Sequence, residues 1–119
     1  MFDQVKRVTE TEASQASFPG TKGQVTVQML QGDPKQGPVV LRLVMEPGAE
    51  IARHYHEGIV ETDYILEGEY INEGQPYPAG TELTVRPNHP HGPHSTRTGV
   101  TFLAMFSGNV DLNDFHLSS

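Results

Sequence analysis

The chain contains no cysteine, so it cannot form a disulfide framework and offers no thiolate to a metal. Positive charge is also scarce, because 8 lysines and arginines face 15 acidic residues and the formal net charge is -7. Nucleic-acid backbones and anionic membranes both require basic patches, so we expect neither as a partner. No run of about 18 apolar residues occurs, so we expect no membrane-spanning helix.

The first residues lack the basic segment and apolar stretch of a secretory signal, so we expect a cytoplasmic protein. A length of 119 residues predicts a single domain over 1–119. Its core is expected at about 24–107, with a lead-in at 1–23 and a tail at 108–119.

Glycine and proline are abundant, with 12 and 9 residues, whereas hydrophobic residues make up only 35%. This composition favours many short strands joined by turns and predicts an all-β fold, an antiparallel sandwich or barrel. Strands are expected at 24–30, 39–45, 54–56, 60–71, 81–86 and 100–106, and a short edge strand around 5–8. Loops are expected at 31–38, 72–80 and 87–92. Gly68 predicts a bulge or a close backbone approach within its strand.

Five of the six histidines fall between positions 54 and 94. His54 and His56 are two residues apart, so in a strand both side chains point to the same face. Glu61 follows after a possible turn, and His91 lies thirty residues further on. Three imidazoles and one carboxylate can hold one divalent transition metal such as iron, zinc, manganese or nickel.

Three neighbouring side chains are candidates for further roles. Counting by twos from Glu61, Asp63 shares its face and can act as a general base or as a partner of a ligating histidine, unless a bulge turns it to solvent. His89 and His94 flank His91, where they either bind substrate at the mouth of a pocket or belong to an exposed loop.

The spacing of these residues resembles the two motifs of the cupin superfamily. Gly48, His54, His56, Glu61 and Gly68 match every position of the first motif. In the second motif Gly80 and His91 match, whereas the usual Pro, Gly and Asn are replaced in turn by Arg86, Asn88 and Ser95. Asn tolerates the left-handed backbone conformation best among non-glycine residues, so the turn at Asn88 is expected to survive.

The sequence is particularly similar to cupin domains of the ChrR anti-sigma-factor type and to the acetylacetone-cleaving dioxygenase group. This resemblance implies a jelly-roll β-barrel with a metal inside one end. It also implies a homodimer, because single-domain cupins commonly pair.

Three functions remain open. Four protein ligands leave one or two coordination positions free, which favours a metal-dependent enzyme acting on a small oxygenated organic substrate. Such an enzyme would be a dioxygenase or a non-oxidative isomerase, cyclase or lyase. The alternatives are a non-catalytic metal-binding sensory or regulatory module, and a sugar-binding or structural barrel with an incidental metal.

Overall fold

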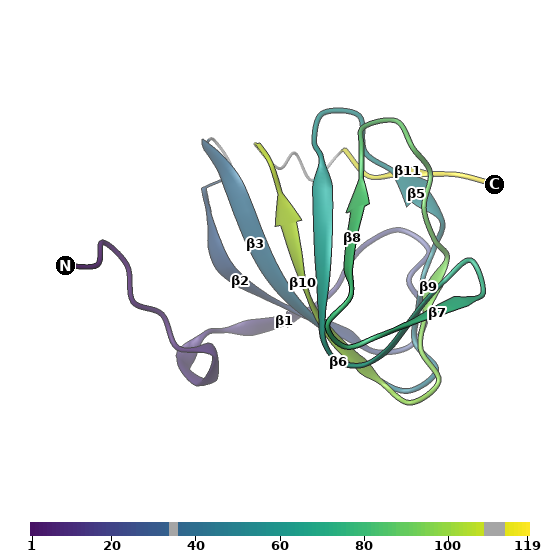
Figure 1. Cartoon of the computed structure of the whole chain (residues 1–119), viewed down its shortest axis with the longest axis horizontal. Coiled ribbons are helices and arrows are strands. Elements are labelled where there is room, and N and C mark those ends of the chain that lie inside the picture. Colours follow the sequence, from purple (N-terminus) through teal and green to yellow (C-terminus); the bar gives the residue numbers. More distant parts are fainter. Residues whose placement is uncertain (34–35, 109–113) are drawn as a thin grey trace.

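The computed structural model describes residues 1–33, 36–108 and 114–119 (Figure 1). These residues form a short 3-10 helix at Val8–Glu10 and eleven strands. The strands are β1 (Ala13–Gln15), β2 (Val25–Asp33), β3 (Gln36–Met45), β4 (Glu50–Ile51), β5 (His54–Tyr55), β6 (Glu61–Asn72), β7 (Gln75–Pro78), β8 (Glu82–Val85), β9 (His94–Ser95), β10 (Val100–Phe106) and β11 (His116–Leu117). No helix in this part of the chain has the length and apolar character needed to cross a membrane.

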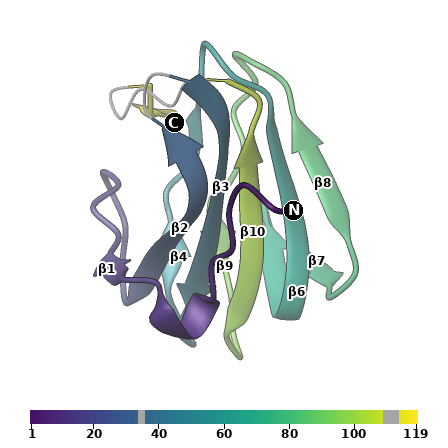
Figure 2. The ribbon, with the colours of Figure 1, turned by 90° about the vertical axis from the view of Figure 1, so that its left-hand side faces the viewer.

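One long strand organises the sheet. The strand order is β1-β2-β3-β10-β6-β9-β4, with β7 and β8 also paired to β6, and β5 pairs separately with β11. The first half of β6 lies between β10 and β8, whereas its second half pairs with β7 and β9. Every one of these pairings is antiparallel, and the sheet curls round on itself (Figures 1 and 2). The predicted antiparallel jelly-roll barrel is confirmed.

The core follows from alternation along the strands, because successive side chains of a strand point to opposite faces. On β10, Val100, Phe102, Ala104 and Phe106 are buried, and the residues between them are only half-buried. Ile65 of β6 faces the same interior and is fully buried. Burying a side chain such as Phe102 or Ile65 contributes about 2 kcal/mol.

Three sequence expectations about strands and loops are wrong. The edge strand is Ala13–Gln15 rather than 5–8, and its exposed polar side chains give it no hydrophobic period. Most of the loop expected at 31–38 is strand, because β2 runs to Asp33 and β3 starts at Gln36, while 34–35 lie outside the described residues. The loop expected at 72–80 contains β7, whose two prolines are tolerated because β7 pairs only with β6.

Gly68 marks both a bulge and a close backbone approach, as predicted. Thr101 pairs with Glu67 and Phe102 with Ile65, so Leu66 is the extra residue on β6. Gly68 has a φ of 87°, and a Cβ there would overlap the carbonyl oxygen of Gly99. The bulge lies where β6 passes from one set of neighbours to the other, so it helps the sheet to bend. Asn88 also adopts the expected left-handed conformation, with a φ of 65°.

A Gly68→Ala substitution should destabilise the barrel more than the same change at Gly74. Both glycines have positive φ values, 87° and 82°, but only at Gly68 does a Cβ meet backbone atoms. We expect a loss of about 1 kcal/mol for Gly74→Ala, and of about 3 kcal/mol or more for Gly68→Ala. Urea unfolding of both variants measures the difference, and equal losses would contradict the close approach.

Candidate metal centre

The four predicted ligands converge on one point. His54, His56, Glu61 and His91 each offer one ligand atom, and these atoms all lie within 4.8 Å of one another. His54 lies on β5 and Glu61 begins β6, while His91 comes from the loop before β9. Two backbone hydrogen bonds of 2.9 Å between His54 and His91 hold the segments together. The role of the four residues as ligands stays a prediction that this geometry supports.

Backbone carbonyl groups orient the imidazole rings. Nδ1 of His54 donates to the carbonyl oxygen of Ala52 at 2.7 Å, and Nδ1 of His56 donates to that of Asp114 at 2.6 Å. Nδ1 of His91 lies 3.4 Å from the carbonyl oxygen of His89. A carbonyl can only accept, so these contacts place a proton on Nδ1, and a neutral ring of this tautomer presents the lone pair of Nε2 toward the cluster.

The inward nitrogen atoms fit a metal ion. Nε2 of His56 and of His91 are buried and, within the described part of the chain, make no hydrogen bond of acceptable geometry. Nε2 of His56 lies 3.0 Å and Nε2 of His91 lies 3.6 Å from the same Oε1 atom of Glu61. Buried polar atoms without partners are costly, and a divalent transition ion would satisfy these nitrogens together with the carboxylate.

The titration of the cluster follows from burial and crowding. Burial, and then the neighbouring His91, lower the pKa of His54 to about 4. Burial also lowers the pKa of His56, but the nearby Glu61 carboxylate and the Asp114 carbonyl outweigh it and raise that pKa overall. Burial would raise the pKa of Glu61, yet His56 and His91 hold it well below its usual value. The cluster therefore contains an ionised Glu61 carboxylate beside the neutral ring of His54. An ionised carboxylate and neutral imidazoles are the forms that bind a metal.

Asp63 points into the protein and is only 2% exposed, so the outward alternative is wrong. The hydroxyl of Tyr70 lies 3.4 Å from Oδ2 of Asp63 and 2.8 Å from Nδ1 of His94, and it links the two. Burial and the adjacent Glu61 carboxylate raise the pKa of Asp63 well above its ordinary value. The catalytic role of Asp63 stays a prediction.

The two flanking histidines differ from each other. His94 lies on β9 and is 4% exposed, so an exposed-loop role is wrong for this residue. Burial lowers the pKa of His94 to about 3, so the ring is neutral at physiological pH. His89 is exposed, and its Nε2 accepts a hydrogen bond from Arg86 at 3.0 Å. Substrate binding by either residue stays a prediction, and His94 lines two of the pockets.

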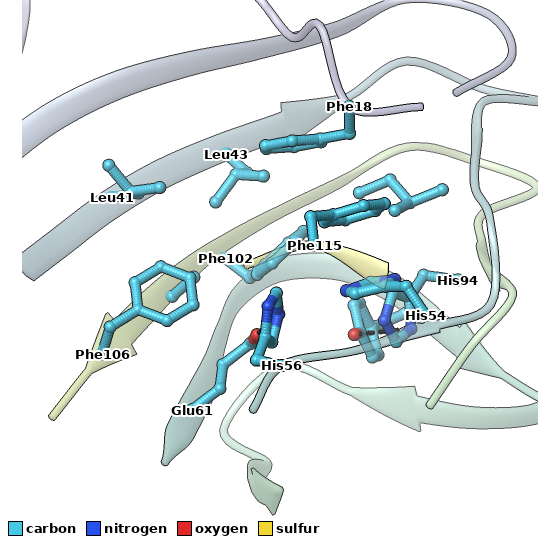
Figure 3. Close-up of a pocket in the computed structure, with 13 residues that line it drawn as sticks. Phe18, Leu41, Leu43, His54, His56, Glu61, His94, Phe102, Phe106 and Phe115 are labelled. Carbon is cyan, nitrogen blue, oxygen red and sulfur yellow. Dashed lines mark hydrogen bonds and ion pairs between the residues drawn. The ribbon is translucent and has the colours of Figure 1, made fainter. Parts of the chain in front are cut away.

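A pocket with a cavity volume of about 50 Å³, partly open to solvent, lies against the cluster (Figure 3). His54, His56 and Glu61 form part of its wall, and most of the remaining wall is aliphatic or aromatic. Tyr70 and His94 border this pocket and also a second cavity, which Asp63 and His91 line. The candidate metal centre is therefore reachable by a small molecule.

Four residues of the site were missed by the sequence analysis, and Tyr70, which links Asp63 to His94, is the first of them. Phe18 of the expected lead-in and Phe115 of the expected tail both line the pocket. Asp114 orients His56 through its carbonyl oxygen, and its carboxylate accepts hydrogen bonds from the backbone N–H groups of Glu57 and Gly58. Isolated phenylalanines in otherwise polar terminal segments were the available signal, because such residues are seldom left without a packing partner.

Comparisons with known proteins agree with this geometry. The profile of the ChrR cupin-like domain matches residues 6–111. No curated protein sequence matches the chain significantly. A predicted oxalate decarboxylase from Thermotoga maritima is 28% identical, with a TM-score of 0.76 over 88% of this chain and 99% of that one.

Two further solved structures share the fold at lower identity. The polyketide cyclase RemF from Streptomyces resistomycificus is 21% identical, with a TM-score of 0.80 over 100% of this chain and 87% of its own. An acetylacetone dioxygenase from Acinetobacter johnsonii is 16% identical, with a TM-score of 0.77 over 100% of this chain and 85% of its own.

A His56→Ala variant should lose the metal while keeping the barrel folded. The imidazole contributes one of four converging ligand atoms, whereas the hydrophobic core is built from other residues. Metal content after purification without added metal, together with circular dichroism, measures both effects. His89→Ala is the matched control, because His89 is exposed and outside the cluster. Full occupancy in His56→Ala would contradict the ligand assignment.

The metal-free protein should lose stability as the pH falls from about 6.5 to 4. His54 and His94 have folded-state pKa values of about 4 and 3, below the ordinary 6.5, so the unfolded chain binds more protons in this range. Each should lower the free energy of unfolding by about 2 kcal/mol at pH 4.5. The raised pKa values of His56 and of Asp63 act in the opposite direction and offset part of this loss.

Urea unfolding of chelator-treated protein at pH 7 and pH 4.5 measures this dependence. In a His94→Gln variant the difference between the two pH values should shrink by the contribution of that ring. An unchanged difference would contradict the burial of a neutral His94.

Proposed function

The chain belongs to the ChrR cupin-like family, and from this premise we propose that it is a metal-dependent enzyme acting on a small oxygenated organic molecule. The position of the pocket carries the proposal, because His54, His56 and Glu61 form part of its wall. A metal held by these residues would face the pocket, whereas a structural metal is enclosed by protein ligands.

In this proposal His54, His56, Glu61 and His91 hold one divalent transition ion, which is iron, zinc, manganese or nickel. Bound there, the ion supplies Lewis-acid chemistry at a carbonyl or enol oxygen or, as iron, redox chemistry with dioxygen. The carbonyls of Ala52 and Asp114 keep two of the rings in the orientation that binding requires. Glu61 lowers the net positive charge of the centre.

We assign proton transfer to Asp63, Tyr70 and His94, which are not among the four candidate metal ligands. The raised pKa of Asp63 favours its protonated form, so Asp63 is better suited to store a proton than to act directly as a base. Tyr70 connects Asp63 to His94, and both Tyr70 and His94 border the main pocket. A proton can thus pass along hydrogen-bonded groups between Asp63 and a bound substrate.

The reaction classes are dioxygenation, or non-oxidative isomerisation, cyclisation or cleavage. The similarity in fold to an acetylacetone dioxygenase and to a polyketide cyclase supports testing both. Homodimerisation and a cytoplasmic location are further parts of the proposal. Exposed apolar side chains at Met1, Phe2 and Val5 are available for a subunit contact.

The protein loaded with Fe(II), Zn(II), Mn(II) or Ni(II) should turn over at least one substrate from a panel of 1,3-diketones and catechol-like phenols. Oxygen uptake follows dioxygenation, and anaerobic product analysis follows the non-oxidative reactions. His56→Ala should lower the activity about 100-fold or more. Mutation of a residue that only hydrogen-bonds to a metal ligand already lowers metal affinity or activity by about 10- to 100-fold. His89→Ala tests the predicted substrate-binding role of His89, and full activity in this variant would place the exposed residue outside the site.

The second candidate is a non-catalytic sensory or regulatory module, which the ChrR-like family description favours. Zinc in the purified protein, with no turnover by any metal form aerobically or anaerobically, would support this candidate and contradict the enzyme.

A further inference from the structure

We propose that the pocket selects an uncharged, mainly apolar substrate and rejects small carboxylates. This inference rests on the proposed function, since it names the class of molecule that reaches the same centre. It follows from the chemistry of the walls and from the placement of the arginines. It also follows from an aromatic roof, by which we mean the stacked rings of Phe18 and Phe115 that cover the cluster.

The walls beyond the candidate ligands are apolar. The side chains that face the pocket away from the histidines and Glu61 include Leu41, Leu43, Ile51, Phe102 and Phe106. Tyr70 and His94 supply the remaining polar groups of the lining, and they are already hydrogen-bonded to each other. No lysine or arginine lines the pocket within the described ranges. A carboxylate that does not coordinate the metal and lies against such walls would lose its water without gaining a partner, which disfavours its binding.

The arginines closest in sequence to these walls are engaged elsewhere. Arg42 on β3 donates to Oε1 of Gln28 at 2.8 Å, and Arg53 pairs with Glu73. Arg97 donates to both carboxylate oxygens of Glu69, at 2.9 and 2.8 Å. None of the three borders the pocket, so none is placed to neutralise an anionic substrate.

An aromatic stack covers the cluster (Figure 3). The rings of Phe115 and His54 are 4.0 Å apart between centroids and inclined by 18°. Phe18 stacks on Phe115, with centroids 5.4 Å apart and an angle of 9°. Phe115 thus fixes one face of His54 and, with Phe18, gives the pocket a second apolar surface. A substrate must place its non-reacting part between this roof and the aliphatic wall.

Hydroxamates test this preference, because they share one metal-chelating head and differ in their tails. The probes are acetohydroxamate, butyrohydroxamate and malonic acid monohydroxamate, whose carboxylate takes nearly the place of the terminal ethyl group of butyrohydroxamate. Zinc content is measured first, and dissociation constants of the zinc-loaded protein are then measured by titration calorimetry. Butyrohydroxamate should bind about tenfold more tightly than acetohydroxamate, because two further CH₂ groups are buried. The malonic compound should bind more weakly than both.

A matched pair of variants tests the role of the wall. Leu41→Arg places a cation at a half-buried wall position and should improve binding of the malonic compound by about tenfold, while weakening that of butyrohydroxamate. Leu66→Arg adds the same charge at a position that is 43% exposed and outside the pocket, so it should leave the order of affinities unchanged.

The outcomes separate this inference from the proposed function. Zinc uptake followed by equal or tighter binding of the malonic compound to the unmodified protein would overturn the inference alone. Zinc uptake without binding of any hydroxamate would also overturn it, since the pocket would be closed to substrates. Failure to take up zinc or any other divalent transition ion would remove the proposed function and this inference with it.

Discussion

The reciprocal backbone hydrogen bonds between His54 and His91 are the interaction on which the site depends. They join two segments that are 37 positions apart in the chain and so set the spacing of their imidazoles. Glu61 reaches the same point because it begins β6, which the sheet holds between β10 and β8. Since these contacts involve the backbone, the geometry of the ligands depends on strand pairing more than on the side chains around them.

The close packing of the buried imidazoles favours a divalent ion over protons in the cluster. Burial and mutual repulsion between the imidazoles oppose protonation of His54, while Glu61 stays ionised between two histidines. A proton can satisfy only one ring, whereas a divalent ion satisfies all of the inward nitrogen atoms together. Asp63, whose pKa moves in the opposite direction to that of Glu61, adds a weakly acidic group without adding a second negative charge.

The parts of the fold and site that could be predicted are those with local spacing rules. Alternation in strands placed His54 and His56 on one face, and the motif intervals brought in Glu61 and His91. The contribution of Asp114 could not be predicted, because its contact with His56 joins residues 58 positions apart and uses a carbonyl group that every residue possesses. The short edge strand β1 was misplaced for a related reason, since its pairing with β2 involves exposed polar residues without a hydrophobic period.

The segments near the two ends of the chain shape the pocket, whereas the barrel positions the candidate ligands. Phe18 and Phe115 come from segments outside the predicted core, yet they meet above the histidines. Phe115 stacks on His54, yet neither aromatic ring offers an atom to a metal. Changes at these two positions would therefore reshape the pocket without removing any of the four candidate ligands.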